Sequence, residues 1–325
     1  MSVVEVRDLH KHYGEVHAVD GLSFGIGEGE VYALLGENGA GKSTAVEILE
    51  GHRTATSGSV EVLGVDPATA GRDFRDRIGI VLQSSGVEAE FTVREVVEQY
   101  GGCYRNPRPR DQVVSLVGLD EKVDARLGSQ EGGQRRRVDH ALTGLEAKAD
   151  ERVGSLSGGQ RRRVDLALGI VGSPDLLFLD EPTTGFDPSA RRLSWDLIEE
   201  MCAGGTTVLL TTHYLDEAEH LADRVGVLTR GRLVAEGTPA ELMAATPTTT
   251  ITFELPAEVD ADALFIPADA TYVDRTCTIE TDAPTRVLAE VMGAAAARGH
   301  ELAGLSVRRP SLEDVFLELA AEDDT

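Results

Sequence analysis

The stretch VYALLGENGAGKSTAVEILE, residues 31–50, decides the fold. Its central part, Gly36–Thr44, fits G-x-x-x-x-G-K-[S/T], a loop whose backbone amides surround phosphate oxygens. The apolar run before this loop is typical of a strand buried on both faces, and the residues after it are typical of a helix. Gly36, Gly39 and Gly41 let the backbone curl inward, and the helix N-terminus favours an anion. The stretch therefore predicts a strand, a phosphate-binding loop and a helix.

Within this loop, the side chains divide into two predicted roles. We expect Lys42 to bring its positive charge to the outer phosphates and the Ser43 hydroxyl to ligate Mg²⁺. Asn38 and Thr44 complete the predicted phosphate-binding set.

A second apolar run, DLLFLDEP (Asp175–Pro182), ends in two adjacent carboxylates. Asp180 stands where Mg²⁺ is held, and Glu181 is placed to polarise an attacking water. An apolar strand ending in Asp-Glu is often only a strand end. Its combination with the phosphate-binding loop makes it a predicted catalytic element.

Apolar strands alternate with helical stretches from residue 3 to about 242, which predicts an α/β fold with a mostly parallel sheet. TTVLLTTH (Thr206–His213) is a further buried strand of this kind. A Thr- and Pro-rich segment then leads into residues 243–325, a smaller α+β domain. In that domain TYVDRTCTIETD, residues 271–282, predicts a hairpin or a single strand, and residues 283–299 predict a helix.

The composition excludes some functions. The 31 Lys and Arg against 56 Asp and Glu give a net charge of −25, which disfavours nucleic acid as a partner. Three widely spaced cysteines, Cys103, Cys202 and Cys277, are typical of reduced thiols. The sequence shows no secretory signal and no apolar run long enough to span a membrane, so we expect a cytoplasmic protein whose membrane role comes through a partner.

Residues 3–242 resemble the ATP-binding subunits of ABC transporters, because the loop, the acidic strand and the segments below follow the family order. The resemblance implies a P-loop NTPase ABC cassette over residues 1–242, with a core sheet, a helical subdomain at about 84–170 and an N-terminal antiparallel sheet. It implies ATP and Mg²⁺ as cofactors. Phe186 and Glu37 depart from the usual family residues, but neither departure removes a functional group.

The resemblance also assigns roles to residues outside the loop. Tyr13 would stack on adenine, Gln83 would join the Mg²⁺ and γ-phosphate shell, and His213 would sense the γ-phosphate. Asp187 lies in the loop that crosses the dimer interface of the family. The signature LSGGQ (Leu156–Gln160) would close on ATP held by the opposite subunit, through Ser157, Gly158, Gly159 and Gln160.

More narrowly, SGGQRRRVDLAL and the C-terminal SLEDVFLEL are similar to the daunorubicin/doxorubicin-resistance type of exporter ATPase. This likeness implies efflux of a drug- or antibiotic-like compound through a separately encoded permease, on the inner face of the cell membrane. A single phosphate-binding loop implies a head-to-tail dimer with a second copy. Two alternatives stay open: a soluble, non-transport ABC ATPase, and a regulatory, weakly hydrolysing subunit.

The signature stretch occurs twice. Residues 118–143 align with residues 144–169, and 17 of the 26 positions are identical, including GGQRRRVD. Glu131 of the first copy stands where the second has Ser157. An ionised Glu131 only accepts hydrogen bonds and repels phosphate, so we predict that the second copy contacts ATP. The first copy is either a tolerated surface insertion, in which an Arg run is usually solvated, or a regulatory element.

Three histidines near the N-terminus, His10, His12 and His17, stand without acidic or cysteine partners at the spacing of a metal-binding motif. We interpret them as solvated side chains.

Overall fold

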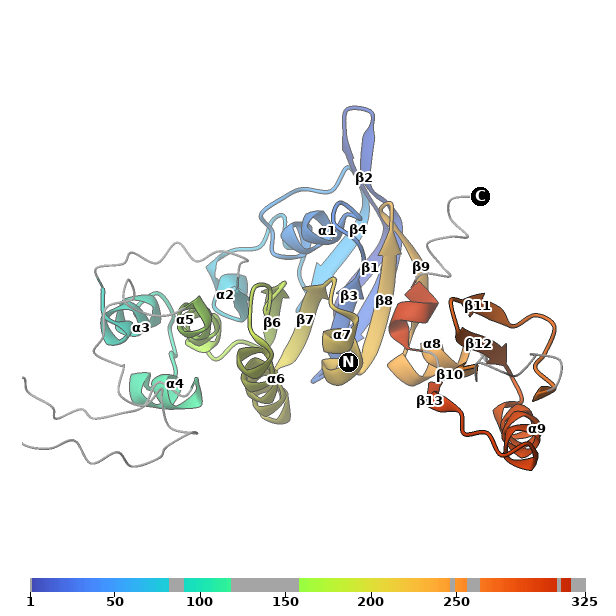
Figure 1. Cartoon of the computed structure of the whole chain (residues 1–325). Helices are drawn as coiled ribbons and strands as arrows, with labels where there is room; N and C mark the ends of the chain where they lie inside the picture. Colours follow the sequence, from blue (N-terminus) through green and yellow to red (C-terminus); the bar gives the residue numbers. More distant parts are fainter. Residues whose placement is uncertain are drawn as a thin grey trace, which may run out of the picture. The chain divides into compact units, whose positions relative to one another are not determined.

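The computed structural model describes residues 2–81, 91–117, 158–245, 249–255, 264–308 and 311–316. The chain divides into two compact units, Met1–Glu236 and Gly237–Thr325. Figure 1 shows their elements along the sequence.

The first unit is built on a six-stranded sheet in the order β5-β6-β7-β3-β8-β9. Its first five strands in this order run parallel to their neighbours. The central strands are buried almost throughout, as their continuous apolar runs predict. The bounds are β3 (Val31–Leu35), β5 (Ile78–Val81), β6 (Leu176–Asp180), β7 (Thr207–Thr212), β8 (Arg224–Thr229) and β9 (Arg232–Gly237).

A three-stranded antiparallel sheet in the order β2-β1-β4 accompanies it. Its strands are β1 (Ser2–Tyr13), β2 (Val16–Gly27) and β4 (Ser57–Val62). One continuous hydrophobic core joins both sheets to the helix α1 (Lys42–Leu49), whose Ala45, Val46, Ile48 and Leu49 are all buried. The helix that follows the phosphate-binding loop is thereby fixed between the two sheets.

The other helices of this unit are α2 (Arg72–Arg75), α3 (Val93–Gly101), α4 (Arg110–Leu116), α5 (Gly158–Ile170), α6 (Pro188–Ala203) and α7 (Leu215–Leu221). Helix α5 packs against β5, and α3 packs against α4 and α5. Thr92 and Glu95 form a reciprocal capping box at the start of α3. Asp187 caps α6, whose first residue is Pro188, a combination that favours helix initiation.

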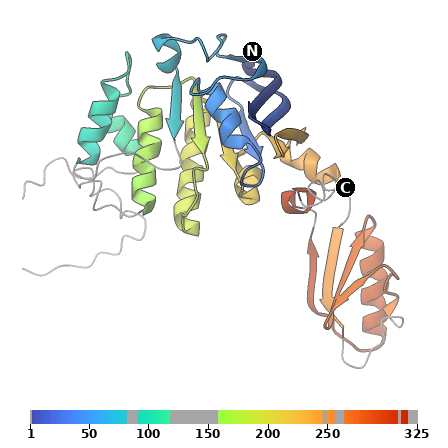
Figure 2. The ribbon, with the colours of Figure 1, turned by 90° about the horizontal axis from the view of Figure 1, so that it is seen from above.

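The second unit is an α+β domain, in which the four-stranded antiparallel sheet has the order β11-β12-β10-β13. Helix α9 lies along one face of this sheet (Figure 2) and packs its apolar side on Ile251, Phe253 and Ile279. The predicted hairpin is confirmed, with a turn at Asp274, whose φ is 56°. The bounds are α8 (Pro239–Ala245), β10 (Thr249–Glu254), β11 (Thr271–Val273), β12 (Thr276–Thr281), α9 (Pro284–Ala297) and β13 (Ala303–Arg308).

The strand order of the first unit positions the predicted site. Strands β6, β7 and β3 are neighbours and parallel, so their carboxyl ends meet at one edge of the sheet. Ligands of open α/β sheets bind at this edge. Within the described part of the chain, no helix is both long and apolar enough to cross a membrane.

Candidate functional site

The phosphate-binding loop connects the end of β3 to the start of α1, as predicted. Two of its glycines are required by close backbone approaches. A Cβ on Gly36 would lie 2.4 Å from the carbonyl oxygen of Leu228, and one on Gly41 would lie 2.2 Å from that of Ala18. Gly41 also has a φ of 103°, which L side chains rarely adopt. The curled loop therefore depends on glycine at both positions.

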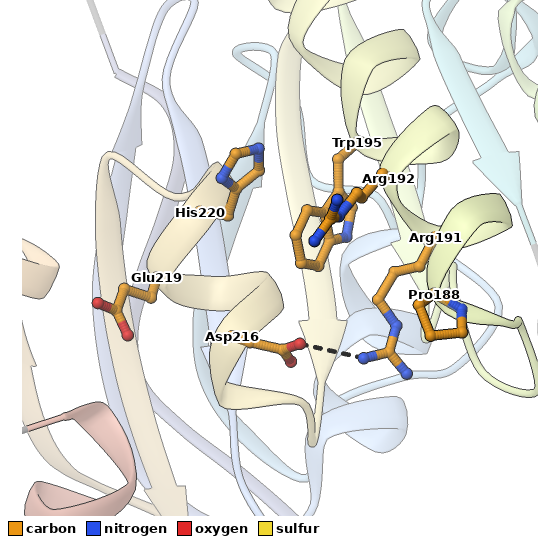
Figure 3. A pocket seen from close by; sticks show the side chains of 7 residues that line it. All are labelled: Pro188, Arg191, Arg192, Trp195, Asp216, Glu219 and His220. Atoms are coloured by element: carbon orange, nitrogen blue, oxygen red, sulfur yellow. Dashed lines mark hydrogen bonds and ion pairs between the residues drawn. The ribbon is translucent and has the colours of Figure 1, made fainter.

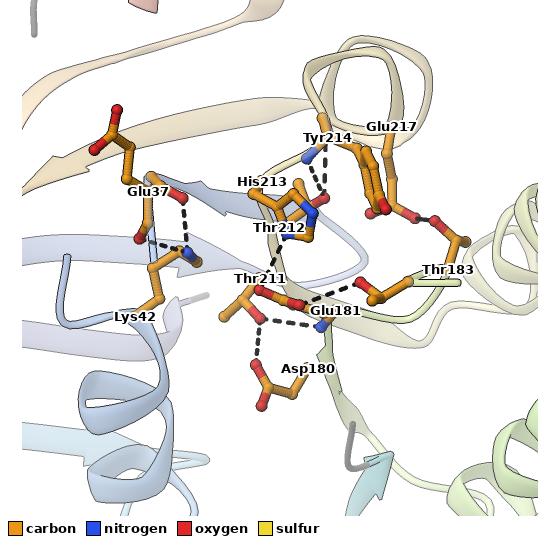
Figure 4. A network of polar contacts seen from close by, with 12 residues as sticks. Glu37, Lys42, Asp180, Glu181, Thr183, Thr211, Thr212, His213, Tyr214 and Glu217 are labelled. Carbon is orange, nitrogen blue, oxygen red and sulfur yellow. Dashed lines mark hydrogen bonds and ion pairs between the residues drawn. The ribbon is translucent and has the colours of Figure 1, made fainter. Parts of the chain in front are cut away.

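Lys42 is buried at the base of this loop, with only 5% of its surface exposed. Its Nζ donates hydrogen bonds to the carbonyl oxygens of Gly36 (2.7 Å) and Glu37 (3.0 Å), as Figure 4 shows for the Glu37 bond. Burial lowers the pKa of Lys42, and the charges of Glu181, Asp180 and Glu37 oppose that shift. The described residues provide no carboxylate in ion-pair contact with its ammonium group, which suits it to attract an anion.

Asp180 ends strand β6, and the neighbouring strand β7 orients it. The Thr211 hydroxyl donates to Oδ1 of Asp180 over 2.5 Å (Figure 4). The backbone N–H of Glu181 donates hydrogen bonds to two oxygens of Thr211, the hydroxyl (3.2 Å) and the carbonyl (3.1 Å). One threonine thus fixes the start of the turn that carries both carboxylates.

Glu181 and His213 meet at the end of these strands. Nδ1 of His213 lies 3.2 Å from Oε1 of Glu181, although without hydrogen-bond geometry. The Thr184 hydroxyl donates to Oε2 of Glu181 over 3.1 Å. Glu181 has a φ of 46°, unusual for a residue other than glycine and a form of strain that often marks functional sites. The structure brings these two predicted residues into direct proximity.

Helix α5 reaches the same turn through Arg162. This side chain is 7% exposed, and it donates to the carbonyl oxygens of Pro182 (3.0 Å), Asp180 (2.9 Å) and Glu181 (3.3 Å). Burial lowers the pKa of Arg162, and nearby carboxylates, Asp165 first, oppose the shift. The arginine run of the second signature copy is therefore partly a packing element: Arg162 and Arg163 are buried, and Arg161 is exposed.

Helix α7 also holds the segment that follows Glu181. Glu217 of α7 is fully buried, and its Oε1 accepts hydrogen bonds from the Thr183 hydroxyl (2.8 Å) and from Nε1 of Trp195 (3.3 Å). Burial raises the pKa of Glu217. Asp187 accepts the N–H groups of Ser189 and Ala190 through Oδ1, each at 2.9 Å. Within the chain, the side chain of Asp187 therefore acts as a helix cap.

Comparison with known proteins identifies this arrangement. The family model described as ABC transporter matches residues 19–184, which contain the loop, the acidic strand and the signature. The chain belongs to the ABC transporter family. It is an ATP-binding and ATP-hydrolysing subunit of that family. The C-terminal domain model of ABC transporter domain-containing proteins matches residues 249–311.

Alignments with similar ABC transporter subunits extend over nearly the whole chain. The Daunorubicin resistance ATP-binding protein DrrA3 of Streptomyces coeruleorubidus is 36% identical, and the alignment covers 99% of this chain and 97% of that protein. The Nod factor export ATP-binding protein I of Rhizobium meliloti (strain 1021) is also 36% identical, over 98% of this chain and 88% of that protein.

Solved structures of ABC subunits share the fold. A structure titled ATP binding subunit of ABC transporter superposes with a TM-score of 0.61 at 24% identity, over 75% of this chain and 92% of that one. That of cbiO1 from Clostridium perfringens, part of the complex cbiONQ, has a TM-score of 0.60 at 28% identity, over 75% of this chain and 91% of that chain.

The remaining predicted residues of this ABC subunit are placed as follows. Tyr13 ends β1 and is 43% exposed, with Nζ of Lys11 5.1 Å and Cζ of Arg53 5.7 Å from its ring centroid. Ser43 is exposed, and Thr44 is half-buried on α1. Gly158, Gly159 and Gln160 form the first turn of α5. Gln83, Ser157 and the first signature copy lie outside the described residues.

Sequence reasoning missed two residues of this site. Thr211 lies opposite Asp180 in the parallel register of β6 and β7, a pairing that the residue spacing alone does not specify. Arg162 had no signal either, because an arginine run is read as a solvated face until its packing is known. Both act on the backbone or the orientation of the predicted catalytic residues.

A pocket of about 500 Å³ lies elsewhere in this unit, between α6 and α7 (Figure 3). It contains no predicted site residue. Arg191 donates to Asp216 over 3.0 Å, and the rings of Trp195 and His220 are 4.6 Å apart. Its other lining residues are Pro188, Arg192 and Glu219. Because these lining residues contact one another across α6 and α7, we attribute the pocket to the packing of the two helices.

The structure corrects the interpretation of His10 and His12 as solvated side chains, whereas His17 is exposed as expected. His10, His12 and Asp20 each offer a ligand atom, and these atoms all lie within 4.8 Å of one another. The acidic partner is distant along the sequence, but the pairing of β1 with β2 places it opposite His10. The side chains of His10, His12 and Asp20 are half-buried and lie together, so they are not isolated groups in solvent.

Proposed function

We propose that this ABC ATPase subunit powers efflux of a drug- or antibiotic-like compound through a separately encoded permease. The support is the near full-length similarity to subunits whose names refer to daunorubicin resistance and to Nod factor export. These relatives include the C-terminal region, so the likeness extends beyond the ATP-binding domain. The exported compound itself contacts the permease, and its identity is therefore set by that partner.

The observation that carries the ATPase mechanism is the convergence of four side chains at one sheet edge. Asp180 ends β6 and Glu181 follows it, His213 follows β7, and Lys42 begins α1, the helix that comes after β3. In this proposal, the loop amides and Lys42 bind the ATP phosphates, with Gly36, Asn38, Gly39, Gly41 and Thr44 forming the cradle.

The donor set also fits Mg²⁺. Asp180 uses Oδ1 in its bond with Thr211, and none of the described residues hydrogen-bonds its Oδ2, which leaves a hard oxygen ligand; Ser43 offers an exposed hydroxyl. Gln83 is the third proposed ligand. When bound, Mg²⁺ neutralises phosphate charge and orients the terminal phosphate.

In this mechanism, Glu181 orients the attacking water and accepts its proton. His213 contacts the γ-phosphate and limits the positions that the Glu181 carboxylate can adopt, since their side chains lie 3.2 Å apart. The Thr184 hydroxyl holds the other oxygen of the same carboxylate, Oε2, by a hydrogen bond. Because these partners hold the group before substrate arrives, the geometry is preorganised.

The site is proposed to be completed by a second copy of the chain. The chain has one phosphate-binding loop, so we propose a head-to-tail dimer in which Ser157, Gly158, Gly159 and Gln160 of each copy contact ATP held by the other. Asp187 would lie at the interface, and Tyr13 would stack on adenine. The dimer would attach to the permease on the inner face of the membrane.

Arg162 supports the proposal that the second signature copy is the working one. This residue joins the helix that begins at Gly158 to the backbone of Asp180, Glu181 and Pro182. A movement of the second signature is thereby transmitted directly to the catalytic turn.

The mechanism is tested with Glu181→Gln, with Glu28→Gln as the control because Glu28 is an exposed carboxylate on another segment. ATP affinity and phosphate release are measured on both. We expect Glu181→Gln to bind ATP as the parent does and to hydrolyse it at least about 100-fold more slowly, the usual minimum for a lost general base. Brisk turnover by this variant would falsify the assignment.

The export proposal has a separate test. Inverted membrane vesicles containing the subunit and its permease are assayed for ATP-dependent uptake of daunorubicin-like compounds, with Glu181→Gln as the inactive control. Uptake that depends on the permease and on active subunit supports drug export. If the protein co-purifies with ribosomes and not with membranes, the soluble, non-transport alternative holds.

A further inference from the structure

Four polar side chains that have no assigned role in hydrolysis gather on the β1–β2 hairpin. The strand register pairs His10 with Asp20 and His12 with His17. Nδ1 of His10 lies 3.1 Å from Oδ1 of Asp20, and the rings of His12 and His17 stack with their centroids 3.9 Å apart. We call His10, His12, His17 and Asp20 the hairpin cluster.

The spacing within this cluster matches a metal coordination shell. Tetrahedral Zn²⁺ with bonds of about 2.0–2.1 Å places neighbouring ligand atoms roughly 3.3 Å apart. His10 and Asp20 already lie at 3.1 Å, and ligand atoms of His10, His12 and Asp20 all lie within 4.8 Å of one another. Small side-chain rotations therefore suffice to bring all three onto one ion.

His12 gives an independent reason to expect a ligand. Its Nε2 is buried from solvent and has no hydrogen-bond partner among the residues that the structure describes. A buried polar atom left in this way costs free energy unless something binds it. A metal ion would satisfy the lone pair of a neutral imidazole nitrogen.

The groups around the cluster support ligation. Oδ1 of Asp8 lies 3.1 Å from Nε2 of His10, the carboxylate–histidine arrangement that orients a metal-binding ring and leaves the other nitrogen for the ion. Arg232 donates from Nε to Oδ2 of Asp20 over 2.9 Å. This bond holds the carboxylate with its other oxygen, Oδ1, 3.1 Å from Nδ1 of His10.

We propose that His10, His12 and Asp20 bind a divalent transition-metal ion of the zinc class. Imidazole nitrogens with one carboxylate are the ligand set of such ions and not of Mg²⁺, which prefers oxygen. His17 lies beside these three ligands, with its Nδ1 3.9 Å from Oδ1 of Asp20 and its ring stacked on that of His12. The site is distinct from the Asp180 carboxylate and requires no nucleotide.

The test measures Zn²⁺ binding to untagged full-length protein by competition with a chromogenic chelator. An excess of Mg²⁺ is present throughout, so that oxygen sites are occupied. The variants are His12→Asn and His10→Gln in the cluster, with His220→Asn as the matched control, an exposed histidine on α7. Asp8→Asn tests the orienting carboxylate, and Cys103→Ser removes the exposed thiol as an alternative ligand. Thermal unfolding without metal establishes that each variant is folded.

We expect one Zn²⁺ site per chain, weakened at least about tenfold by His12→Asn and by His10→Gln, because even the loss of an orienting partner costs about 10–100-fold. Asp8→Asn should weaken binding as well, and His220→Asn and Cys103→Ser should leave it unchanged. Co²⁺ substituted at the site should show the visible absorption of nitrogen and oxygen ligands without a thiolate band. Absence of a stoichiometric Zn²⁺ site, or equal affinity in folded His12→Asn and parent, overturns the proposal.

Discussion

Arg162 offers a sharp test of how the signature helix holds the catalytic turn. We consider Arg162→Met, which retains a long apolar stem and removes the guanidinium. Its hydrogen bonds to the backbone of residues 180–182 are lost, two of them short, at 2.9 and 3.0 Å, and one of 3.3 Å. Hydrogen bonds to charged groups contribute about 1.5–3 kcal/mol each, and an acceptor left buried adds its own desolvation cost. Relief from burying the guanidinium offsets part of this loss, so we expect a net destabilisation of about 3 kcal/mol.

Thermal and urea unfolding of nucleotide-free protein measure this effect. For a domain of this size, about 3 kcal/mol corresponds to a fall in the melting temperature of roughly 6–12 °C. Arg161→Met is the matched control, because Arg161 is the exposed neighbour on the same helix, and exposed substitutions usually change stability by less than about 0.5 kcal/mol. We also expect slower ATP hydrolysis by Arg162→Met at temperatures where it stays folded, since Glu181 loses support for its backbone. A melting temperature within about 2 °C of the parent, or equal to that of Arg161→Met, would refute the reasoning.

Two further predictions concern buried charge and the duplicated signature. Burial, with the charges of Asp180 and Glu47, raises the pKa of Glu50 to about 8 from 4.5. Between about pH 4.5 and about pH 8 the folded state therefore retains a proton that the unfolded state releases. The free energy of unfolding consequently falls as the pH rises through this range, by about 1.4 kcal/mol per pH unit. Glu50→Gln should gain stability relative to the parent as pH rises from 6 to 9; parallel pH profiles in urea unfolding would contradict it. Deletion of residues 118–143 should leave ATPase activity intact while Ser157→Glu abolishes it, and loss of activity in a folded deletion variant would instead show that the chain uses both copies.

Much of the fold and the catalytic set was predictable from short-range patterns. The phosphate-binding loop is a local motif, because its chemistry depends on backbone amides and on glycine at fixed spacing. Buried parallel strands appear as continuous apolar runs, and functional residues follow their carboxyl ends. Lys42, Asp180 and Glu181 could therefore be predicted from these patterns, and His213 from the family resemblance; the described structure places the four at one edge. The small domain was predictable in the same way from its hairpin and helix.

The sequence by itself determined the family, the α/β architecture and the set of residues proposed to bind the nucleotide, because these depend on local order along the chain. Only the tertiary structure decided which residues support them. Thr211 binds Asp180 through the register of adjacent strands, and Arg162 is buried by the packing of α5. Asp20 joins His10 and His12 because antiparallel pairing folds β2 back on β1. Such contacts depend on register and burial, and neither is written in the spacing of the residues concerned.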